Sequence, residues 1–308
     1  MRAILVGAVE SSRIALQCLA RSPAWDLGAI FTLPPELAQR HSDFVDLSAD
    51  ARAAGAPLIT LSNINSDAAF AEIKAIDPDY IFVIGWSQIC GARFMASARL
   101  GLIGFHPAPL PRLRGRAVIP WTILLDEPIS ASSLFLIDEG VDSGPILGQR
   151  YFHVAPDETA ATLYAKHMAM LDDMLPGVLD DVAQCKARMQ SQDERYATYA
   201  TRRRPEDAVI DWSEPADKAG RLIRACGAPY PGAWTMLDGE RIVIEEARPV
   251  CLPQYRAAMT GQIVERQTDG FLVKCGDGRG LLVTRWRRAR EGPLPVHAIL
   301  GLRAGAKQ

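Results

Sequence analysis

The chain has 308 residues, of which 48% are apolar and 23% are charged, and its formal net charge at pH 7 is −2. These values are ordinary for a globular protein long enough for two domains, and they exclude a general electrostatic attraction to nucleic acid or anionic membranes. No apolar run reaches the roughly 18 residues of a membrane-spanning helix, so we expect no membrane partner.

Strand-like and helix-like patterns alternate over the first two hundred residues. Near-continuous apolar strands separated by helices are typical of a doubly wound parallel sheet, a Rossmann-like α/β fold. The expected strands, in chain order, are residues 3–6, 27–32, 57–60, 80–85, 101–106 and 132–137. The expected helices are residues 11–21, 43–54, 67–76, 117–125 and 159–175.

The pattern changes after about residue 190. Gln190 to Arg204 is polar and ends in Thr201-Arg202-Arg203-Arg204-Pro205, which indicates an extended linker. One helix and five short strands separated by glycine-containing turns follow, and this set predicts a small OB-like β-barrel. These elements are residues 216–226, 234–237, 241–247, 261–265, 270–275 and 280–286. We therefore predict two domains, 1–204 and 205–308.

The six cysteines give no indication of a metal site or a disulfide framework. They are scattered, without the paired spacing of zinc sites and redox pairs. The segment Met1 to Gly7 indicates a short strand and lacks the length of a signal peptide. We therefore expect no metal, and a reducing, cytoplasmic location. The cysteines are Cys18, Cys90, Cys185, Cys226, Cys251 and Cys275.

Two of the predicted strands end in loops that carry candidate catalytic groups. His106 ends the strand 101–106, and Asp138 to Gly144 is an acidic turn after the strand 132–137. Because the carboxyl ends of parallel strands share one edge of an open sheet, we expect a His–carboxylate pair at this edge. The other histidines lie in helical or exposed contexts, where a structural or solvated role is expected: His41, His153, His167 and His297.

Three arginines follow His106 on a loop rich in proline and glycine. Arg112, Arg114 and Arg116 form either a solvated face or an anion clamp, for which a carboxylate or a diphosphate is a suitable ligand. Two other interpretations have little support. Gly7 follows the first strand without a GxGxxG pattern, and Ser143 is not in a GxSxG elbow.

Three segments together resemble the formyltransferase family that uses 10-formyltetrahydrofolate. They are His106…Leu110-Pro111…Arg114-Gly115, Asp138…Gly140-Val141-Asp142-Ser143-Gly144, and Ile223-Arg224-Ala225…Pro229-Tyr230-Pro231-Gly232-Ala233. With Asp211-Trp212, the likeness spans residues 1–303. It is especially close to sugar N-formyltransferases such as the enzyme that modifies UDP-4-amino-4-deoxy-arabinose, and it extends to methionyl-tRNA formyltransferase.

The resemblance implies a catalytic Asn, His and Asp. The histidine corresponds to His106 and the aspartate to Asp142, but the position of the Asn is Gly104. In the family the Asn amide helps to hold the formyl oxygen as it becomes an oxyanion, and losing such a donor costs about 2.7–4 kcal/mol in other enzymes. Three explanations are open: protonated His106 supplies the charge, a backbone N–H or a water replaces the amide, or the protein has lost the activity or acts on something else.

The resemblance also implies where the two substrates bind. One loop corresponds to the pterin-binding loop of the family, although core packing alone also explains Trp86. The expected folate contacts are Gly85, Trp86, Ser87, Gln88, Ile89, Asp138, Gly140 and Val141. The acceptor is expected beside a second set, in which a nucleotide diphosphate finds bidentate partners. That set is Pro109, Arg112, Arg114, Gly115 and Arg116.

We therefore expect an N-formyltransferase that moves the formyl group of 10-formyltetrahydrofolate to a nucleotide-linked amino sugar, as in polysaccharide biosynthesis. His106 is expected to move the protons and Asp142 to orient it. A basic strip around Trp286 is either a solvated face or an RNA contact, and the net charge disfavours nucleic acid. The strip is Arg285, Arg287, Arg288 and Arg290. A hydroxyornithine or methionyl-tRNA acceptor, an inactive folate-binding homologue and a homodimer stay open.

Overall fold

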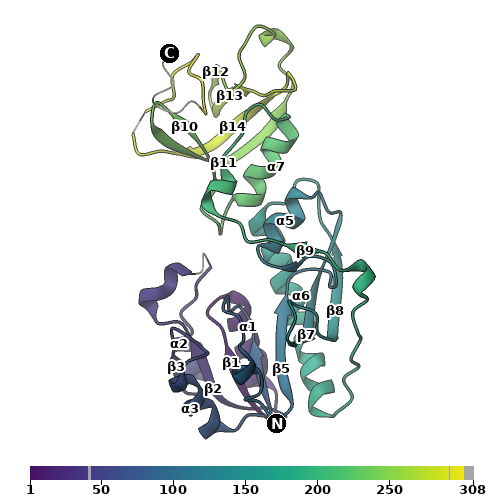
Figure 1. Ribbon diagram of the computed structural model, residues 1–308. Coiled ribbons are helices and arrows are strands. Elements are labelled where there is room, and N and C mark those ends of the chain that lie inside the picture. Colours follow the sequence, from purple (N-terminus) through teal and green to yellow (C-terminus); the bar gives the residue numbers. More distant parts are fainter. Residues whose placement is uncertain (41–42, 291, 302–308) are drawn as a thin grey trace. The chain divides into compact units, whose positions relative to one another are not determined.

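The computed structural model describes residues 1–40, 43–290 and 292–301 (Figure 1), so His41 and the end of the predicted second domain lie outside the described residues. The chain forms two compact units. The first contains Met1–Val118, Pro128–Val154 and Tyr164–Thr201, and the second contains Ile119–Glu127, Ala155–Leu163 and the chain from Arg202 on. Two short stretches before residue 204 group with the C-terminal part, and the domain boundary at 204 itself stays a prediction.

A seven-stranded sheet organises the first unit, in the order β3-β2-β1-β4-β5-β7-β8. The first five strands in this order are parallel, whereas β7 is antiparallel to β5 and β8 is antiparallel to β7. The predicted α/β class with a parallel sheet is confirmed, with an antiparallel pair added at one edge. The strands are β1 (Arg2–Val6), β2 (Asp26–Thr32), β3 (Leu58–Thr60), β4 (Tyr80–Val83), β5 (Gly101–His106), β7 (Ile129–Leu136) and β8 (Ile146–His153).

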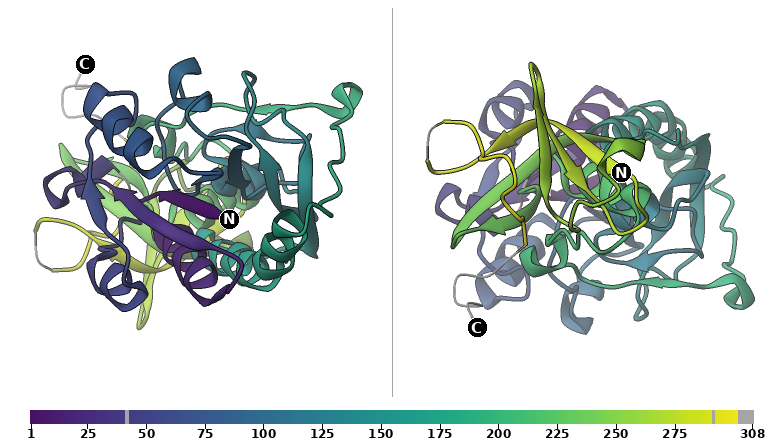
Figure 2. Two further views of the ribbon diagram at one scale, coloured as in Figure 1. Left: turned by 90° about the horizontal axis from the view of Figure 1, so that it is seen from below. Right: turned by 90° about the horizontal axis from the view of Figure 1, so that it is seen from above.

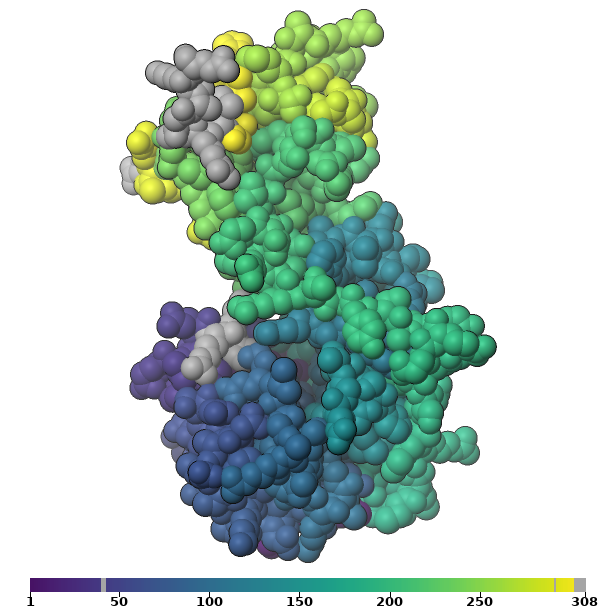
Figure 3. Space-filling view, viewed as in Figure 1, coloured from purple at the N-terminus to yellow at the C-terminus, as the bar shows by residue number. Residues whose placement is uncertain are grey.

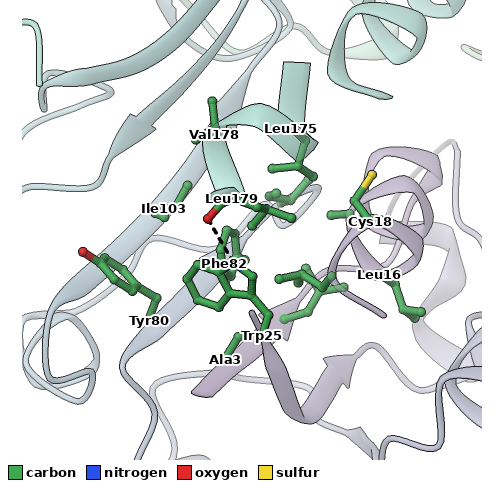
Figure 4. Close-up of a cluster of buried hydrophobic side chains, with 14 of the residues drawn as sticks. Ala3, Leu16, Cys18, Trp25, Tyr80, Phe82, Ile103, Leu175, Val178 and Leu179 are labelled. Atoms are coloured by element: carbon green, nitrogen blue, oxygen red, sulfur yellow. Dashed lines mark hydrogen bonds between the residues drawn. The ribbon is translucent and has the colours of Figure 1, made fainter. Parts of the chain in front are cut away.

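Helices cover both faces of this sheet, as Figure 2 shows. The apolar sides of α1 and α6 pack on one face, and those of α3 and α4 pack on the other. Figure 4 shows the first of these two cores, in which the Trp25 ring packs against Phe82 and its indole N–H donates to the Leu179 carbonyl at 3.1 Å. The helices before residue 190 are α1 (Glu10–Arg21), α2 (Ser48–Ala54), α3 (Asp67–Ile76), α4 (Ala92–Met95), α5 (Val118–Leu124) and α6 (Ala160–Ala183), with a 3-10 turn η1 (Pro35–Arg40). Of these, α5 groups with the second unit.

The direction of β7 corrects the sequence-based interpretation of the sheet edge. Because β7 is antiparallel to β5, its carboxyl end lies beside Leu102 and not beside His106, and the Ile137 N–H donates to the Leu102 carbonyl at 2.9 Å. An apolar run predicts a buried strand but contains no information about its direction. The loop after β7 therefore has to reach back along the sheet before any of its carboxylates can meet His106.

Two further elements differ from the prediction. The edge strand β8 was not expected, because its half-exposed residues form no apolar run. The helix α6 continues past the expected end at Leu175 and through Pro176 to Ala183. Its apolar face goes on at helical spacing in Val178, Leu179 and Val182, so tertiary packing outweighs the cost of an internal proline.

Most of the segment predicted as a linker, up to Thr201, belongs to the first unit instead. Gln190 pairs with Ile146, and β9 (Tyr199–Ala200) lies parallel to β6 (Arg114–Gly115), with the 3-10 turn η2 (Glu194–Tyr196) before it. We call residues 190–200 the tether. It lies directly on the loop that follows His106.

The second unit contains α7 (Ala216–Cys226) and a five-stranded antiparallel sheet in the order β10-β11-β14-β13-β12. A core of apolar side chains from both, including Ile223 and Phe271, confirms the predicted small β domain with one helix. Its other elements are β10 (Ala233–Leu237), β11 (Glu240–Val250), β12 (Ile263–Gln267), β13 (Gly270–Lys274), β14 (Gly280–Arg287) and the turns η3 (Pro205–Ala208) and η4 (Pro253–Tyr255). Over the described part of the chain, every helix is too short or too polar to cross a membrane.

Candidate active site

His106 ends β5 with its imidazole buried and only 7% of the side chain exposed. Its Nε2 lies 2.8 Å from the carbonyl oxygen of Leu113. A carbonyl oxygen only accepts hydrogen bonds, so Nε2 carries a hydrogen and donates it. The nitrogen that can gain or lose a proton is therefore Nδ1, which lies 3.5 Å from the Asp142 carboxylate.

Asp142 reaches His106 from the loop between β7 and β8. Its Oδ2 accepts a hydrogen bond of 2.8 Å from the Gly115 N–H, so the same oxygen is held from the loop that follows His106. Asp142 has a φ of 49°, a left-handed conformation that costs on the order of 1 kcal/mol in a residue with a side chain. The predicted His–carboxylate pair is thus present in the structure, although the loop and not a shared strand edge brings it together.

The loop that carries Asp142 is shaped by its own side chains. The Asp138 carboxylate accepts from the Gly140 N–H at 3.1 Å and from the Ser143 hydroxyl at 2.7 Å, which closes a tight turn. A Cβ atom at Gly144 would lie 1.8 Å from the Leu136 carbonyl oxygen, so this position requires glycine. Asp138 and Gly140, predicted as folate contacts, therefore also hold the loop in shape.

Gly104, which stands where the resemblance implies an Asn, faces an aromatic ring. It pairs across the sheet with Phe135 of β7, and a Cβ atom at Gly104 would lie 2.9 Å from the Phe135 ring and 3.1 Å from Ile137. The ring is buried against Leu110 and Ile146. Phe135 and Ile137 thus fill the space that an Asn side chain would need, and glycine at this position fits the surrounding packing.

The three arginines of the loop have different surroundings. Arg112 and Arg116 are exposed, whereas the Arg114 side chain is only 1% exposed. Arg114 donates to Gln192 and Glu194 of the tether, with a shortest distance of 2.7 Å to Glu194. The hydrogen bond from Arg114 lowers the pKa of Glu194 and raises that of Arg114. Arg114 therefore ties the tether to the loop, and we remove it from the predicted diphosphate contacts.

Pro109, another residue predicted to bind the acceptor, is also buried. It closes a turn in which the Arg112 N–H donates to its carbonyl at 2.9 Å. Two polar residues that the sequence analysis missed fix this turn: Ser133 donates to the Ala108 carbonyl at 2.7 Å, and Gln149 donates to the Leu110 carbonyl at 3.0 Å. Both come from the antiparallel pair β7 and β8, whose pairing with β5 the strand pattern did not show.

The loop after β4, predicted to hold the pterin, is fixed by hydrogen bonds to the loop after β3, in both directions. Gly85 has a φ of 72°, and a Cβ there would lie 2.2 Å from Val9, so the turn requires glycine. The Gln88 amide donates to the Ser62 carbonyl at 2.6 Å. Asn65, which the sequence analysis missed, donates to the Ile89 carbonyl at 3.0 Å. Gln88 thus holds the loop, while Ile89 is 87% exposed.

The surface of the first unit is hollowed where the parts of the chain coloured blue and teal meet in Figure 3. A separate open cavity of about 610 Å³ lies in the second unit, lined among others by Arg256, Lys274 and Arg279. Lys274 donates to the Gly278 carbonyl and Arg279 pairs with Asp217, and the lining contains neither a histidine nor a glutamate. We therefore place the candidate active site at His106.

Among the described residues no group of His, Cys, Asp and Glu is arranged to hold a metal ion.

Two family models match the chain. The model described as "Formyl transferase" matches residues 29–179, and the model described as "Formyl transferase, C-terminal domain" matches residues 203–302. A methionyl-tRNA formyltransferase of Anaeromyxobacter sp. (strain K) is 32% identical over 258 residues, which cover 84% of this chain and 81% of the relative.

Solved structures of similar fold include two N-formyltransferases. A sugar 3N-formyl transferase, crystallised in the presence of dTDP and 5-N-formyl-THF, has a TM-score of 0.66 and 16% identity, over 94% of this chain and 98% of its own. An N-formyltransferase of Helicobacter canadensis, in complex with folinic acid and dTDP-3-aminofucose, has a TM-score of 0.66 and 16% identity, over 92% of this chain and 98% of its own. At this identity the likeness shows a shared fold.

Proposed function

The chain belongs to the formyl transferase family, and from this premise we propose that it formylates the amino group of a nucleotide-linked amino sugar. It is a folate-dependent formyltransferase, and its formyl donor is 10-formyltetrahydrofolate. The proposal concerns the acceptor, the cytoplasmic location and the roles of the site residues. The observation that carries it is the placement of His106 Nδ1, 3.5 Å from Asp142, beside a loop that exposes Arg112 and Arg116.

The loops beside His106 fit the folate. Ile89 and Val141 are 87% and 56% exposed, and such aliphatic surface gains from being covered by an aromatic ring system. The buried Trp86 Nε1 has no acceptor among the described residues. Trp86 and Ile137 pack against the same buried cluster, so the two loops belong to one neighbourhood. We therefore assign folate contacts to Gly85, Trp86, Ser87, Ile89, Asp138, Gly140 and Val141, and a supporting role to Gln88.

The bound donor supplies the formyl carbon that the acceptor amine attacks. The attacking amine has to lose one proton, and the departing nitrogen has to gain one. His106 can do both at Nδ1, because Nε2 is held by the Leu113 carbonyl and an imidazole changes its charge near neutral pH. Asp142 stabilises the imidazolium, and the Gly115 N–H keeps its carboxylate in place.

Gly104 brings no amide to the developing negative charge on the formyl oxygen. The Phe135 ring fills the space of the missing side chain. We therefore assign the stabilisation of that negative charge to protonated His106. An inactive folate-binding homologue is the contrary hypothesis. A retained His106–Asp142 pair, with both partners held by backbone groups, supports the active enzyme.

Arg112 and Arg116 are the groups that we assign to the nucleotide diphosphate. Both are exposed on the loop between His106 and α5, and a guanidinium binds phosphate oxygens in a bidentate manner. Gly115, between them, presents its N–H to Asp142 and thereby connects the acceptor side to the catalytic pair.

The test is a mass-spectrometric assay with 10-formyltetrahydrofolate and a panel of acceptors: UDP- and dTDP-linked amino sugars, hydroxyornithine and methionyl-tRNA. We expect one amino sugar to gain about 28 mass units, and His106→Ala to abolish the gain. His153→Ala is the matched control, because His153 is an exposed histidine of the same unit. Folate binding without formylation of any sugar would contradict the proposal.

Methionyl-tRNA is the second candidate acceptor, favoured by curated relatives such as the methionyl-tRNA formyltransferase of Anaeromyxobacter. The arginine strip of the second unit does not favour it, because three glutamates offset most of its four positive charges. Arg285 pairs with Glu245 and Glu246, Arg287 with Glu245, and Arg288 and Arg290 with Glu240. Binding to tRNA that weakens steeply with salt would support this candidate over the sugar.

A further inference from the structure

Gln192 of the tether connects the backbone around Asp142 to the Arg114 side chain. Its Nε2 donates to the Asp142 carbonyl and to the Gly144 carbonyl, each at 2.8 Å. Its Oε1 accepts two hydrogen bonds from Arg114, at 2.9 and 3.0 Å. Both donors and both acceptor positions of the amide are therefore used, and this pattern leaves one orientation of the group.

Arg114 sets that orientation. Its buried guanidinium presents donors only, so the amide oxygen of Gln192 faces it and the amide nitrogen faces the two carbonyls. Glu194 binds the other side of the guanidinium at 2.7 and 3.0 Å and balances its charge. The chain of contacts runs from Glu194 through Arg114 and Gln192 to the backbone of Asp142.

The backbone of Asp142 needs such support. Its φ of 49° is sparsely populated for a residue with a side chain, and such a conformation persists only where surrounding contacts fix it. The two carbonyls that Gln192 binds lie on either side of Ser143, so the amide clamps this turn. A change in that turn would move the carboxylate away from His106 and from the Gly115 N–H.

We propose that Gln192 is a positioning residue of the formyl transfer, which keeps the Asp142 carboxylate at His106 through the Arg114–Gln192 contact. This inference rests on the role of Asp142 in the proposed function. It also explains why a polar segment between the two parts of the chain folds onto the loop after His106. Gln192 itself reaches the backbone of Asp142 and Gly144, so it acts on the reaction through another residue.

The test replaces Gln192 by Met, which has a similar length and no amide, and follows two neighbouring backbone amides by hydrogen exchange. The Gly115 N–H donates to the Asp142 carboxylate, whereas the Arg116 N–H donates to the Ala200 carbonyl of the tether. We expect Gln192→Met to speed the exchange of Gly115 roughly tenfold and to leave Arg116 within about twofold. Gln190→Met, an exposed glutamine on the same tether, is the control and is expected to change neither.

Equal acceleration of both amides would mean that the tether merely loosens, and no change at Gly115 would mean that Gln192 does not hold Asp142. Either result overturns the proposal. The exchange experiment uses the free protein, so it decides the matter even if no acceptor is formylated. With an acceptor, Gln192→Met should lower kcat about tenfold or more and leave KM within about threefold. In an Asp142→Asn background, the same change should lower kcat little further.

Discussion

The Phe135 ring of β7 lies against the backbone of Gly104 in β5, where a Cβ atom would be only 2.9 Å from the ring. The two residues are cross-strand partners, so glycine at one position permits a large ring at the other. This pair explains how the strand that carries His106 packs with glycine at the position where the resemblance implies an Asn.

The fit of Gly104 and Phe135 can be measured by stability. Gly104→Ala should lower the free energy of unfolding by about 1–3 kcal/mol, because the added methyl group overpacks the site. In a Phe135→Leu background the same change should cost less, with a coupling of about 0.5–3 kcal/mol in a double-mutant cycle of urea unfolding. Additive costs would show that the ring does not limit the space.

The imidazole of His106 should be required for turnover and not for donor binding. We expect His106→Gln to lower kcat by about 10²–10⁴-fold, because the proton transfers lose their acid–base group. Folate affinity, measured by fluorescence titration, should change little. A comparable loss in folate affinity would instead make His106 a binding residue.

The carboxylate of Asp142 should act through its charge. Asp142→Asn keeps the shape of the side chain and is expected to lower kcat roughly 10²–10⁴-fold, since the amide no longer stabilises an imidazolium. Glu139→Gln removes an exposed carboxylate of the same loop and serves as the matched control, with little expected loss. Steady-state kinetics of both variants at pH 7 make the comparison, and equal losses would argue against a specific role for Asp142.

Arg116 and Arg114 should separate into a binding and a structural role. Arg116→Ala is expected to raise the KM of the nucleotide-linked acceptor about tenfold, which corresponds to one lost hydrogen bond to a charged group. Arg114→Met should instead lower the free energy of unfolding by about 1–3 kcal/mol, because the half-buried Gln192 side chain loses the donors to its Oε1. Unfolding curves and acceptor KM values for both variants give the check, and a reversed pattern would refute the assignment.

Acid should weaken the tether through Glu194. Its pKa is held below the ordinary 4.5 by the hydrogen bond from Arg114. A carboxyl group whose pKa is lower in the folded state contributes stability at pH values above its unfolded pKa, and loses it as the pH falls through the folded pKa. The stability difference between Glu194→Gln and the parent should therefore be full above pH 4.5 and vanish in stronger acid. Urea unfolding at several pH values measures it, and a difference that persists in strong acid would contradict the assignment.

Much of the fold follows from patterns of neighbouring residues. The helix 216–226 is found at its predicted bounds, and the strand 101–106 begins and ends as expected. Both are read from local apolar periodicity and from glycine and proline at their ends, which depend on a few residues nearby. The candidate pair His106 and Asp142 was also found from sequence, because both follow apolar runs and match a family pattern.

Other features depend on contacts between distant parts of the chain. No local pattern in the sequence indicates the direction of β7 or the burial of Arg114 beside residues about eighty positions later. The same holds for the hydrogen bond from Gln192 to the Asp142 carbonyl. A polar stretch has the same composition whether it is solvated or folded onto a loop, so Gln190 to Arg204 was predicted as a linker. Local apolar patterns thus predict most of the elements, and three sequence motifs resemble those of the family to which the chain belongs. Only the tertiary structure decides which polar groups share a hydrogen bond, because that depends on which strands pair and how the loops close.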